Sequence, residues 1–241
     1  MSLTVAMVQS SYIPWKGYFE MILKADRFVF YDDVQFTKED WRNRNQIKTK
    51  DGLKWLTVPC GQPKGRNICD VEIESDYWQR KHWDAIRHAY AKAPAFNKVA
   101  PFFEELYRSQ RWSSLSAMNQ TFTRRIAQEW LGSTTEFTDS RDYPTPPGLA
   151  RDERWISMLE KMGATRFLIG PKARNYLDDK KIEEIHRRGI ELVWMNYDGY
   201  REYEQLHPPF VHSLSVIDLL FNCGDKSRDW ILDKSGGVAH E

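Results

Sequence analysis

Short apolar runs and polar segments alternate along the first third of the chain. Residues 3–8 form an apolar run typical of a buried strand, and residues 17–25 place Phe19 and Ile22 on one face of a short helix. A second apolar run, residues 27–31, has the length of another strand. Because a right-handed crossover joins a strand, a helix and a strand in this order, the pattern predicts two parallel neighbouring strands.

The last third of the chain repeats this alternation. Helical periodicity over residues 151–162 and 178–188 alternates with strand-like runs at 166–169 and 190–197. Another strand-like run lies at 135–138. Since alternating strands and helices are typical of a parallel sheet, we expect an α/β protein with a mostly parallel, Rossmann-like sheet and a helical insertion.

The middle of the chain is helical by period. Apolar stripes of amphipathic helices run through residues 78–92, 102–108 and 115–131. We therefore divide the chain into an N-terminal α/β part with the main polar site at 1–76, a helical insertion at 77–131, a C-terminal α/β part of the same core at 132–225 and a mobile tail at 226–241.

A basic, glycine-containing loop precedes the helical insertion. Residues 61–67 lie between strand-like runs at 53–59 and 69–73. Two glycines make this loop flexible, and its Lys and Arg side chains suit an anionic ligand. We interpret it as a candidate lid.

The segment after residues 27–31 is almost wholly polar, as expected where a strand leads into a site. Asp32 and Asp33 follow the strand directly, and we expect both to be catalytic carboxylates. Indole, guanidinium and amide groups suited to a sugar, phosphate or carboxylate come next, at Trp41, Arg42, Asn43, Arg44 and Asn45. The alternative is a solvated loop with helix-capping aspartates.

A second polar and aromatic segment follows the first strand. It contains the expected substrate-binding residues Gln9, Tyr12, Trp15 and Tyr18. Because parallel strands end at the same edge of a sheet, this segment and the one that begins at Asp32 should converge. Loop amides there can receive an anion and flat rings can bind a sugar or base, although the aromatic residues would serve equally well in the core.

A third polar strand end follows residues 166–169. Gly170 lets the backbone approach a ligand, while Lys172 and Arg174 can neutralise a phosphate or carboxylate. Alternatively, the two cations are surface charges before a helix capped near Asp178. Neither a Walker A nor a Gly-x-Gly-x-x-Gly motif occurs, so the cofactor remains unassigned.

One acidic residue lies inside an otherwise apolar helix near the C-terminal end. Residues 215–222 predict a buried helix, and Asp218 must be paired or hydrogen-bonded there, because an unpaired buried charge costs several kcal/mol. We list Asp218 as a third catalytic candidate beside the alternative of a structural pair. His82 follows two basic residues on a predicted helix and is a candidate for anion contact or a surface histidine.

Composition narrows the classes of partner. The 241 residues include 35 Lys plus Arg and 34 Asp plus Glu, so no global charge argues for nucleic acid. No apolar stretch approaches the roughly 20 residues of a membrane span, and the N-terminus does not resemble a secretory signal. Three cysteines and the spacing of the histidines form no metal motif. We expect a cytoplasmic protein without a metal site.

Several of these segments together resemble the hallmark segments of the WbqC-like protein family. The matching segments are residues 9–19, 31–36, 41–45, 92–94, 170–173, 176–178 and 213–224. The resemblance covers residues from about 5 to 225, in the right order. One departure is Gln9-Ser10, where the family often has Gln-Pro, which loosens that loop without removing its polar groups.

The resemblance implies a bacterial protein that acts in O-antigen or other surface-polysaccharide biosynthesis. Its specific expectation is a transferase that moves an acyl or aminoacyl group to a sugar amine. The partners would be an activated or carrier-bound sugar and an acyl or aminoacyl carrier. Two alternatives remain: a glycosyltransferase using a nucleotide-sugar, in which Asp32 and Asp33 hold a divalent metal, and a non-catalytic binding or assembly protein.

Overall fold

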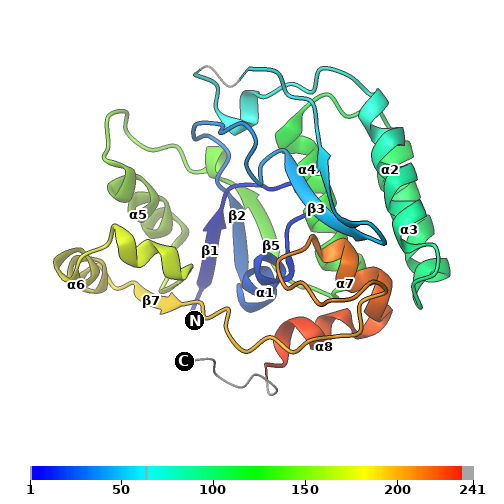
Figure 1. Cartoon of the computed structure of the whole chain (residues 1–241). Helices are drawn as coiled ribbons and strands as arrows, with labels where there is room; N and C mark the ends of the chain where they lie inside the picture. The colour runs from blue at the N-terminus through cyan, green and yellow to red at the C-terminus, as the bar shows by residue number, and fades with distance from the viewer. Residues whose placement is uncertain (1, 63–64, 235–241) are drawn as a thin grey trace.

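A five-stranded parallel sheet lies at the centre of the computed structural model, which describes residues 2–62 and 65–234. The strand order is β5-β2-β1-β6-β7, and every neighbouring pair is parallel (Figure 1). The strands are β1 (Thr4–Val8), β2 (Arg27–Phe30), β5 (Glu136–Asp139), β6 (Arg166–Ile169) and β7 (Glu191–Trp194). The predicted Rossmann-like α/β class is confirmed.

The strand order reverses between β1 and β6. From β1 the chain adds β2 and β5 on one side and then β6 and β7 on the other. In such doubly wound sheets, the crevice beyond the carboxyl ends of the two strands at the reversal is the usual ligand site. Here those ends are Val8 and Ile169.

Helices cover both faces of the sheet because successive strand residues point to opposite sides. On one face, Val5, Val29 and Phe167 pack against α5 (Arg151–Met162) and α6 (Asp179–Arg187). On the other, Ala6 and Phe28 belong to a core that also contains residues of α1 (Lys16–Lys24) and α7 (Val216–Cys223). The sheet therefore separates two hydrophobic clusters.

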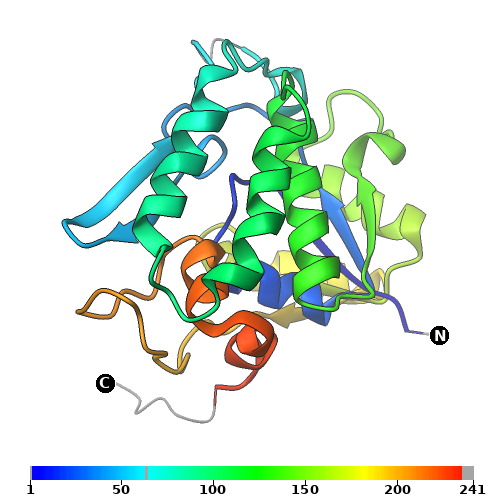
Figure 2. The same ribbon diagram turned by 90° about the vertical axis from the view of Figure 1, so that its right-hand side faces the viewer.

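Helices at 77–125 extend the larger cluster away from the sheet. They are α2 (Tyr77–Tyr90), α3 (Phe96–Arg108) and α4 (Leu115–Arg125), followed by a π-helical turn at Ile126–Trp130 (Figure 2). Helix α3 begins at Phe96, six residues before the predicted start at residue 102. The helix therefore contains Pro101, which the prediction placed outside it. Buried Val99 and Phe103 on its inner face offset the lost backbone hydrogen bond.

An antiparallel hairpin lies beside the main sheet, made of β3 (Arg44–Thr49) and β4 (Gly52–Thr57). The sequence indicated β4 but not β3, whose inward face carries the buried polar Asn45 beside Ile47. The expected strand at 69–73 is wrong. Ile68–Asp70 form a 3-10 turn, and Glu72 makes only an isolated bridge with Ser114.

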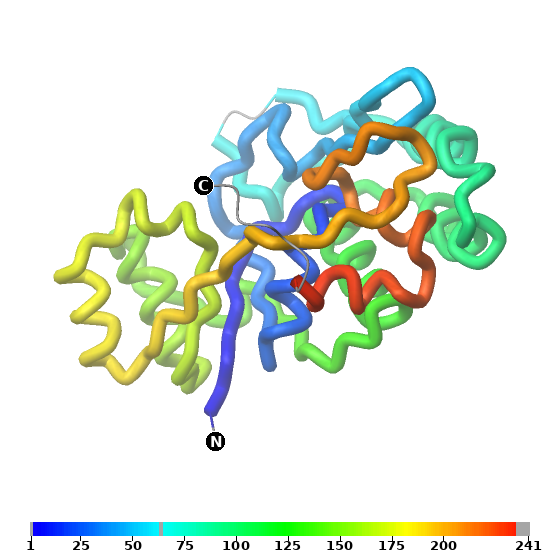
Figure 3. Tube along the Cα trace, turned by 60° about the horizontal axis from the view of Figure 1, so that its bottom comes forward, coloured from blue at the N-terminus to red at the C-terminus, as the bar shows by residue number. Residues whose placement is uncertain are grey.

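The end of the chain crosses from β7 to the hairpin and returns (Figure 3). It continues into α7, a 3-10 turn at Gly224–Lys226 and α8 (Ser227–Leu232). The expectation of a mobile tail at 226–241 is therefore wrong for α8, where Ile231 is fully buried in the core, while residues 235–241 lie outside the described part of the chain. None of the helices in the described ranges has the length and apolar character needed to cross a bilayer.

Candidate functional site

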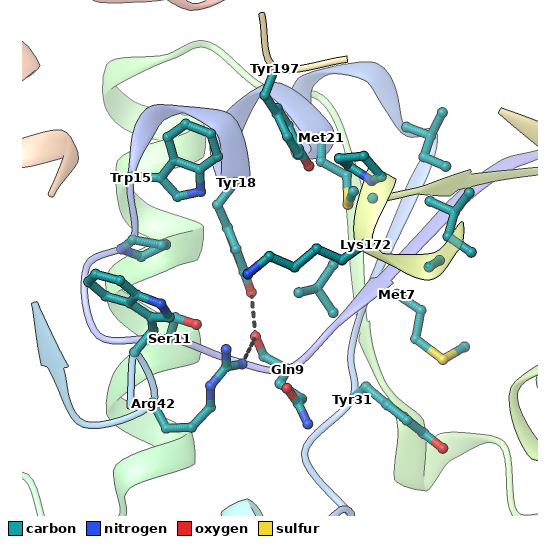
Figure 4. A pocket seen from close by; sticks show the side chains of 18 of the residues that line it. Met7, Gln9, Ser11, Trp15, Tyr18, Met21, Tyr31, Arg42, Lys172 and Tyr197 are labelled. Atoms are coloured by element: carbon teal, nitrogen blue, oxygen red, sulfur yellow. Dashed lines mark hydrogen bonds between the residues drawn. The ribbon is translucent and has the colours of Figure 1, made fainter. Parts of the chain in front are cut away.

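A cavity of about 630 Å³ opens at the reversal of the strand order. Its floor includes Val8 and Gln9 at the end of β1 and Ile169 and Gly170 at the end of β6 (Figure 4). One wall is the loop after β1 together with the start of α1. The facing wall is the 3-10 turn Pro171–Asn175 after β6. The cavity thus occupies the position that the fold favours for a ligand.

The charged side chains that line this cavity are all cationic. They are Arg42, Arg151 and Lys172, and the lining contains no Asp, Glu, His or Cys. Aromatic residues form much of the remaining surface: Trp15, Tyr18, Tyr31, Trp41, Trp155, Phe167, Tyr176 and Tyr197. This combination suits an anionic ligand that also carries a ring.

Lys172 is the cation most available to a ligand. Its side chain extends across the cavity toward the Tyr18 ring (Figure 4). Among the residues that the structure describes, its ammonium group has no hydrogen-bond or ion-pair partner, and the residue is exposed. The Arg151 guanidinium lies over the Tyr176 ring, with its Cζ 5.3 Å from the ring centroid.

Arg42 is held in the cavity wall by backbone oxygens. Its Nη1 donates to the Gln9 carbonyl at 3.1 Å, and the Tyr18 hydroxyl donates to the same oxygen at 3.1 Å. Burial lowers the pKa of the Arg42 guanidinium from its usual value. These two bonds use the backbone carbonyl of Gln9. The side-chain amide of Gln9 makes no hydrogen bond to the rest of the described chain.

The loop after β1 is held from two distant parts of the chain. Asn45 Nδ2 donates to the carbonyls of Tyr12 and Ile13, at 3.1 and 2.8 Å. Ser215 Oγ donates to the Ile13 carbonyl at 2.8 Å. Ile13 itself has φ +36°, a left-handed conformation that costs a β-branched residue energy and persists only where the surroundings impose it.

Asp32 lies beneath this loop and is fully buried. Its carboxylate accepts hydrogen bonds from Ser10 N at 2.8 Å, Ser116 Oγ at 2.5 Å and Gln120 Nε2 at 3.1 Å. These bonds connect the end of β2 to the loop and to α4. Asp32 is absent from the cavity lining, so its geometry supports the loop rather than contacting a ligand there.

Asp33 turns away from Asp32. Its carboxylate accepts a hydrogen bond from Ser140 Oγ at 2.5 Å and forms an ion pair with Arg154. It lines a second, open hollow of about 550 Å³ beside the proline-rich segment 144–149. The structure therefore does not bring the two adjacent aspartates into one cleft, contrary to expectation.

Asp218 is surrounded by donors inside the core. Tyr90 and Tyr203 hydroxyls donate to it at 3.0 and 2.7 Å, and Gln205 Nε2 donates at 2.9 Å. Burial raises the pKa of this carboxyl group, while these hydrogen bonds act in the opposite direction. Asp218 joins α7 to the segment that crosses from β7, and it does not line the cavity.

The expected substrate-binding residues divide into two groups. Eight line the cavity: Gln9, Trp15, Tyr18, Trp41, Arg42, Asn45, Gly170 and Lys172. Four do not: Tyr12, Asn43, Arg44 and Arg174. Of these, Asn43 is buried and donates to the Val58 carbonyl at 3.0 Å, and Arg174 stacks over Trp194 with its Cζ 4.2 Å from the ring centroid.

Tyr12 and His82 form part of the core beside the first wall. The Tyr12 hydroxyl lies 2.8 Å from His82 Nδ1 and also contacts the Tyr107 hydroxyl. Burial lowers the pKa of His82 to about 3, so the ring is neutral near pH 7. Both interpretations of His82 from the sequence, an anion contact and a surface histidine, are therefore wrong, because the ring is buried and neutral.

Several lining residues were missed by sequence reasoning. Arg151 and Trp155 come from the first turns of α5, and Tyr31 and Tyr197 follow β2 and β7. The available signal was the position of each at a predicted element end on the same sheet edge. The Tyr31 hydroxyl is buried, and the Arg154 guanidinium lies over the Tyr31 ring with its Cζ 5.4 Å from the ring centroid.

Neither the candidate lid nor a metal cluster adds to the cavity. In the described part of loop 61–67, Arg66 donates back to the carbonyls of Cys60 and Gln62, at 2.8 and 2.5 Å, and residues 63–64 lie outside the description. Within residues 2–62 and 65–234, no group of three His, Cys, Asp or Glu side chains is placed to hold a metal ion.

A doubly wound parallel sheet with helices on both faces defines an α/β protein with a Rossmann-like fold. The chain belongs to the WbqC-like protein family, whose model matches residues 9–230. It is 40% identical over 230 residues to the uncharacterized protein Rv1507c of Mycobacterium tuberculosis, covering 94% of this chain and 96% of that protein. No solved structure matches the chain.

Proposed function

We propose that the protein is a transferase of bacterial surface-polysaccharide biosynthesis that binds an activated sugar, such as a nucleotide-sugar, in the cavity at the reversal of the strand order. The specific reaction proposed is transfer of an acyl or aminoacyl group to the amine of that sugar. The observation that carries the proposal is a cavity with three cations, many aromatic rings and no carboxylate. Phosphates favour the cations, and a base or sugar ring favours the aromatic surface.

The proposed transfer assigns different work to the two walls. The acceptor nitrogen bonds to the acyl carbonyl carbon, the bond from that carbon to the leaving sulfur or oxygen breaks, and the nitrogen passes a proton to the leaving group. On the first wall, the free side-chain amide of Gln9 is the donor available to the carbonyl oxygen as it gains charge. Lys172 on the second wall, together with Arg42 and Arg151, binds the phosphates.

The two alternatives receive less support. A metal-dependent glycosyltransferase would need carboxylates facing the diphosphate, whereas Asp32 and Asp33 point elsewhere and Asp32 is occupied by three donors. A non-catalytic assembly protein would not require a cavity with an unpartnered cation, whereas a non-catalytic binding protein would share this cavity and would bind the sugar without turning it over. Activity that disappears with EDTA and returns with Mn²⁺ would favour the glycosyltransferase.

Calorimetric titration with UDP-, GDP- and dTDP-linked sugars tests the binding step. We expect at least one to bind, and Lys172→Ala to weaken that binding about tenfold, which corresponds to about 1.4 kcal/mol. Lys180→Ala, an exposed lysine on α6 outside the cavity, is the matched control and should bind like the parent. A panel without any binder, or equal affinities in both variants, would contradict the proposal.

A further inference from the structure

Two exposed tryptophans lie next to each other at the edge of the cavity, Trp41 in the turn before β3 and Trp55 on β4. The side chains of Trp41 and Trp55 are 44% and 42% exposed, and their ring centroids lie 5.7 Å apart at an angle of 36°. Arg44 stacks on Trp55 with its Cζ 4.3 Å from the ring centroid. Two neighbouring indoles so open to solvent are unusual unless something binds them.

The hairpin places polar groups around these rings. Directly opposed residues share a face, and the pairs Arg44–Thr57 and Gln46–Trp55 lie on the face opposite the buried Ile47. Arg44 and Gln46 thus flank Trp55 with flat, hydrogen-bonding side chains. We call Trp41, Arg44, Gln46 and Trp55 the Trp shelf.

The Trp shelf is continuous with the cavity. Trp41 both lines the cavity and stacks against Trp55, so a molecule that emerges past Trp41 meets Trp55 next. A pyranose ring has apolar C–H faces that pack on an indole. Its hydroxyl groups accept hydrogen bonds from Arg and Gln side chains and can donate to the Gln oxygen. Charge on this face is low, because the Arg44 guanidinium lies 3.8 Å from Glu39.

We propose that the Trp shelf is a second binding site, which holds further sugar units of a saccharide chain whose phosphate-bearing terminal unit enters the cavity. This second site rests on the proposed function and deepens it, because it makes the acceptor sugar part of an oligosaccharide. A membrane surface is less favoured. The Lys48 ammonium on this face is buried against Gln205, and Arg44 is paired with Glu39, so the face lacks the basic cluster that anionic lipid attracts.

The test is affinity as a function of chain length, measured by calorimetry on the full chain with glucosamine, N-acetylglucosamine and mannose oligomers of one to four units. We expect affinity for at least one series to rise about tenfold from one unit to three, the gain from one stacked ring. Trp55→Ala should lose that gain and Trp55→Phe should keep most of it. Tyr77→Ala, which removes an exposed ring on α2, is the control and should retain the gain.

Three outcomes would overturn the proposal. The first is affinity independent of length in every series. The second is a length gain that survives in Trp55→Ala. The third is Trp55-dependent binding to vesicles of phosphatidylglycerol and phosphatidylethanolamine without any saccharide gain, which would make the hairpin a membrane contact. Nucleotide-sugar binding by the parent and by Lys172→Ala is measured separately, so failure of the cavity proposal is distinguishable from failure of the Trp shelf.

Discussion

The two walls of the cavity are built in different ways. The first wall, residues 9–18, is held by hydrogen bonds from remote segments, including Asn45, Ser215 and the Trp41 carbonyl, which accepts from Tyr12 N at 2.9 Å. The second wall, residues 170–176, hydrogen-bonds mainly within itself, as in Ala173 N to Gly170 O at 3.0 Å. In the described part of the chain, its connections to its surroundings are mainly the apolar packing of Ala173 and ring stacking.

This difference separates two tasks that a binding site must perform. A wall fixed by many remote hydrogen bonds presents its groups in one geometry and loses little entropy when a ligand binds. A wall with few such bonds opens locally at low free-energy cost and can move toward the ligand. We expect the first wall to set the orientation of the ligand and the second, which carries Lys172, to close on its charge.

The largest effect should come from removing the support of the first wall. Asp32→Ala leaves the buried Ser10 N and Ser116 Oγ donors without this acceptor, whereas Gln120 Nε2 still donates to Asp139 at 2.8 Å. Since each unsatisfied buried donor costs about 1–3 kcal/mol, we expect a loss of about 3 kcal/mol or more in the free energy of unfolding. Asp33→Ala removes a partly exposed ion pair and should cost about 1 kcal/mol. Urea unfolding at pH 7 measures both. Equal losses in the two variants would show that the buried network is not the anchor.

A smaller effect should appear in acid, because burial keeps the His82 ring neutral. The pKa of His82 is about 3 when folded and near 6.5 when unfolded, so below pH 6.5 the unfolded chain takes up a proton that the folded chain refuses. The contribution of the neutral His82 ring to the free energy of unfolding is therefore fully present above pH 6.5. It is lost as pH falls toward 3, by about 2 kcal/mol between pH 6 and 4.5.

His82→Gln should flatten this acid dependence in urea unfolding measured at a series of pH values. His88→Gln, an exposed histidine on the same helix, is the control and should leave the slope as in the parent. If the parent and His82→Gln lose stability with the same slope, the buried neutral ring is not its source.

The smallest effect concerns motion and needs no substitution. Amides of residues 171–176 should exchange with deuterium faster than those of residues 10–16 in the free protein, because fewer remote contacts oppose local opening. A bound nucleotide-sugar should slow exchange about tenfold in the second wall and much less in the first. Mass spectrometry of exchanged peptides measures this, and equal protection of both walls on binding would remove the distinction between them.

Much of the fold could be predicted from apolar periodicity. The bounds of α5 and β6 agree with the pattern because each buries an apolar face or run. The hairpin strand β3 could not be found this way, since buried Asn45 interrupts its inward face and its partners are backbone carbonyls far along the chain. Tertiary contacts there override the local pattern.

The site was predictable in position but not in the role of each polar residue. A polar segment after a strand marks the edge of the sheet where ligands bind, and Gln9, Arg42 and Lys172 do line the cavity. A buried carboxylate satisfied by the protein has the same sequence signature as one that faces a ligand. Asp32 and Asp218 illustrate this, because their hydrogen-bond donors lie up to 128 residues away.

The hydrogen bond between Ser215 and Ile13 affects the order in which parts of the protein fold during synthesis. It joins residues 202 positions apart, and it holds a loop whose Ile13 conformation is unfavourable on its own. During synthesis the first strand leaves the ribosome long before Ser215 is added. The apolar strands and helices can begin to pack in that interval, whereas the first wall reaches its final shape only when nearly the whole polypeptide has emerged. The first wall of the candidate site, which begins within the first ten residues of the chain, is therefore among the last parts to reach its final structure.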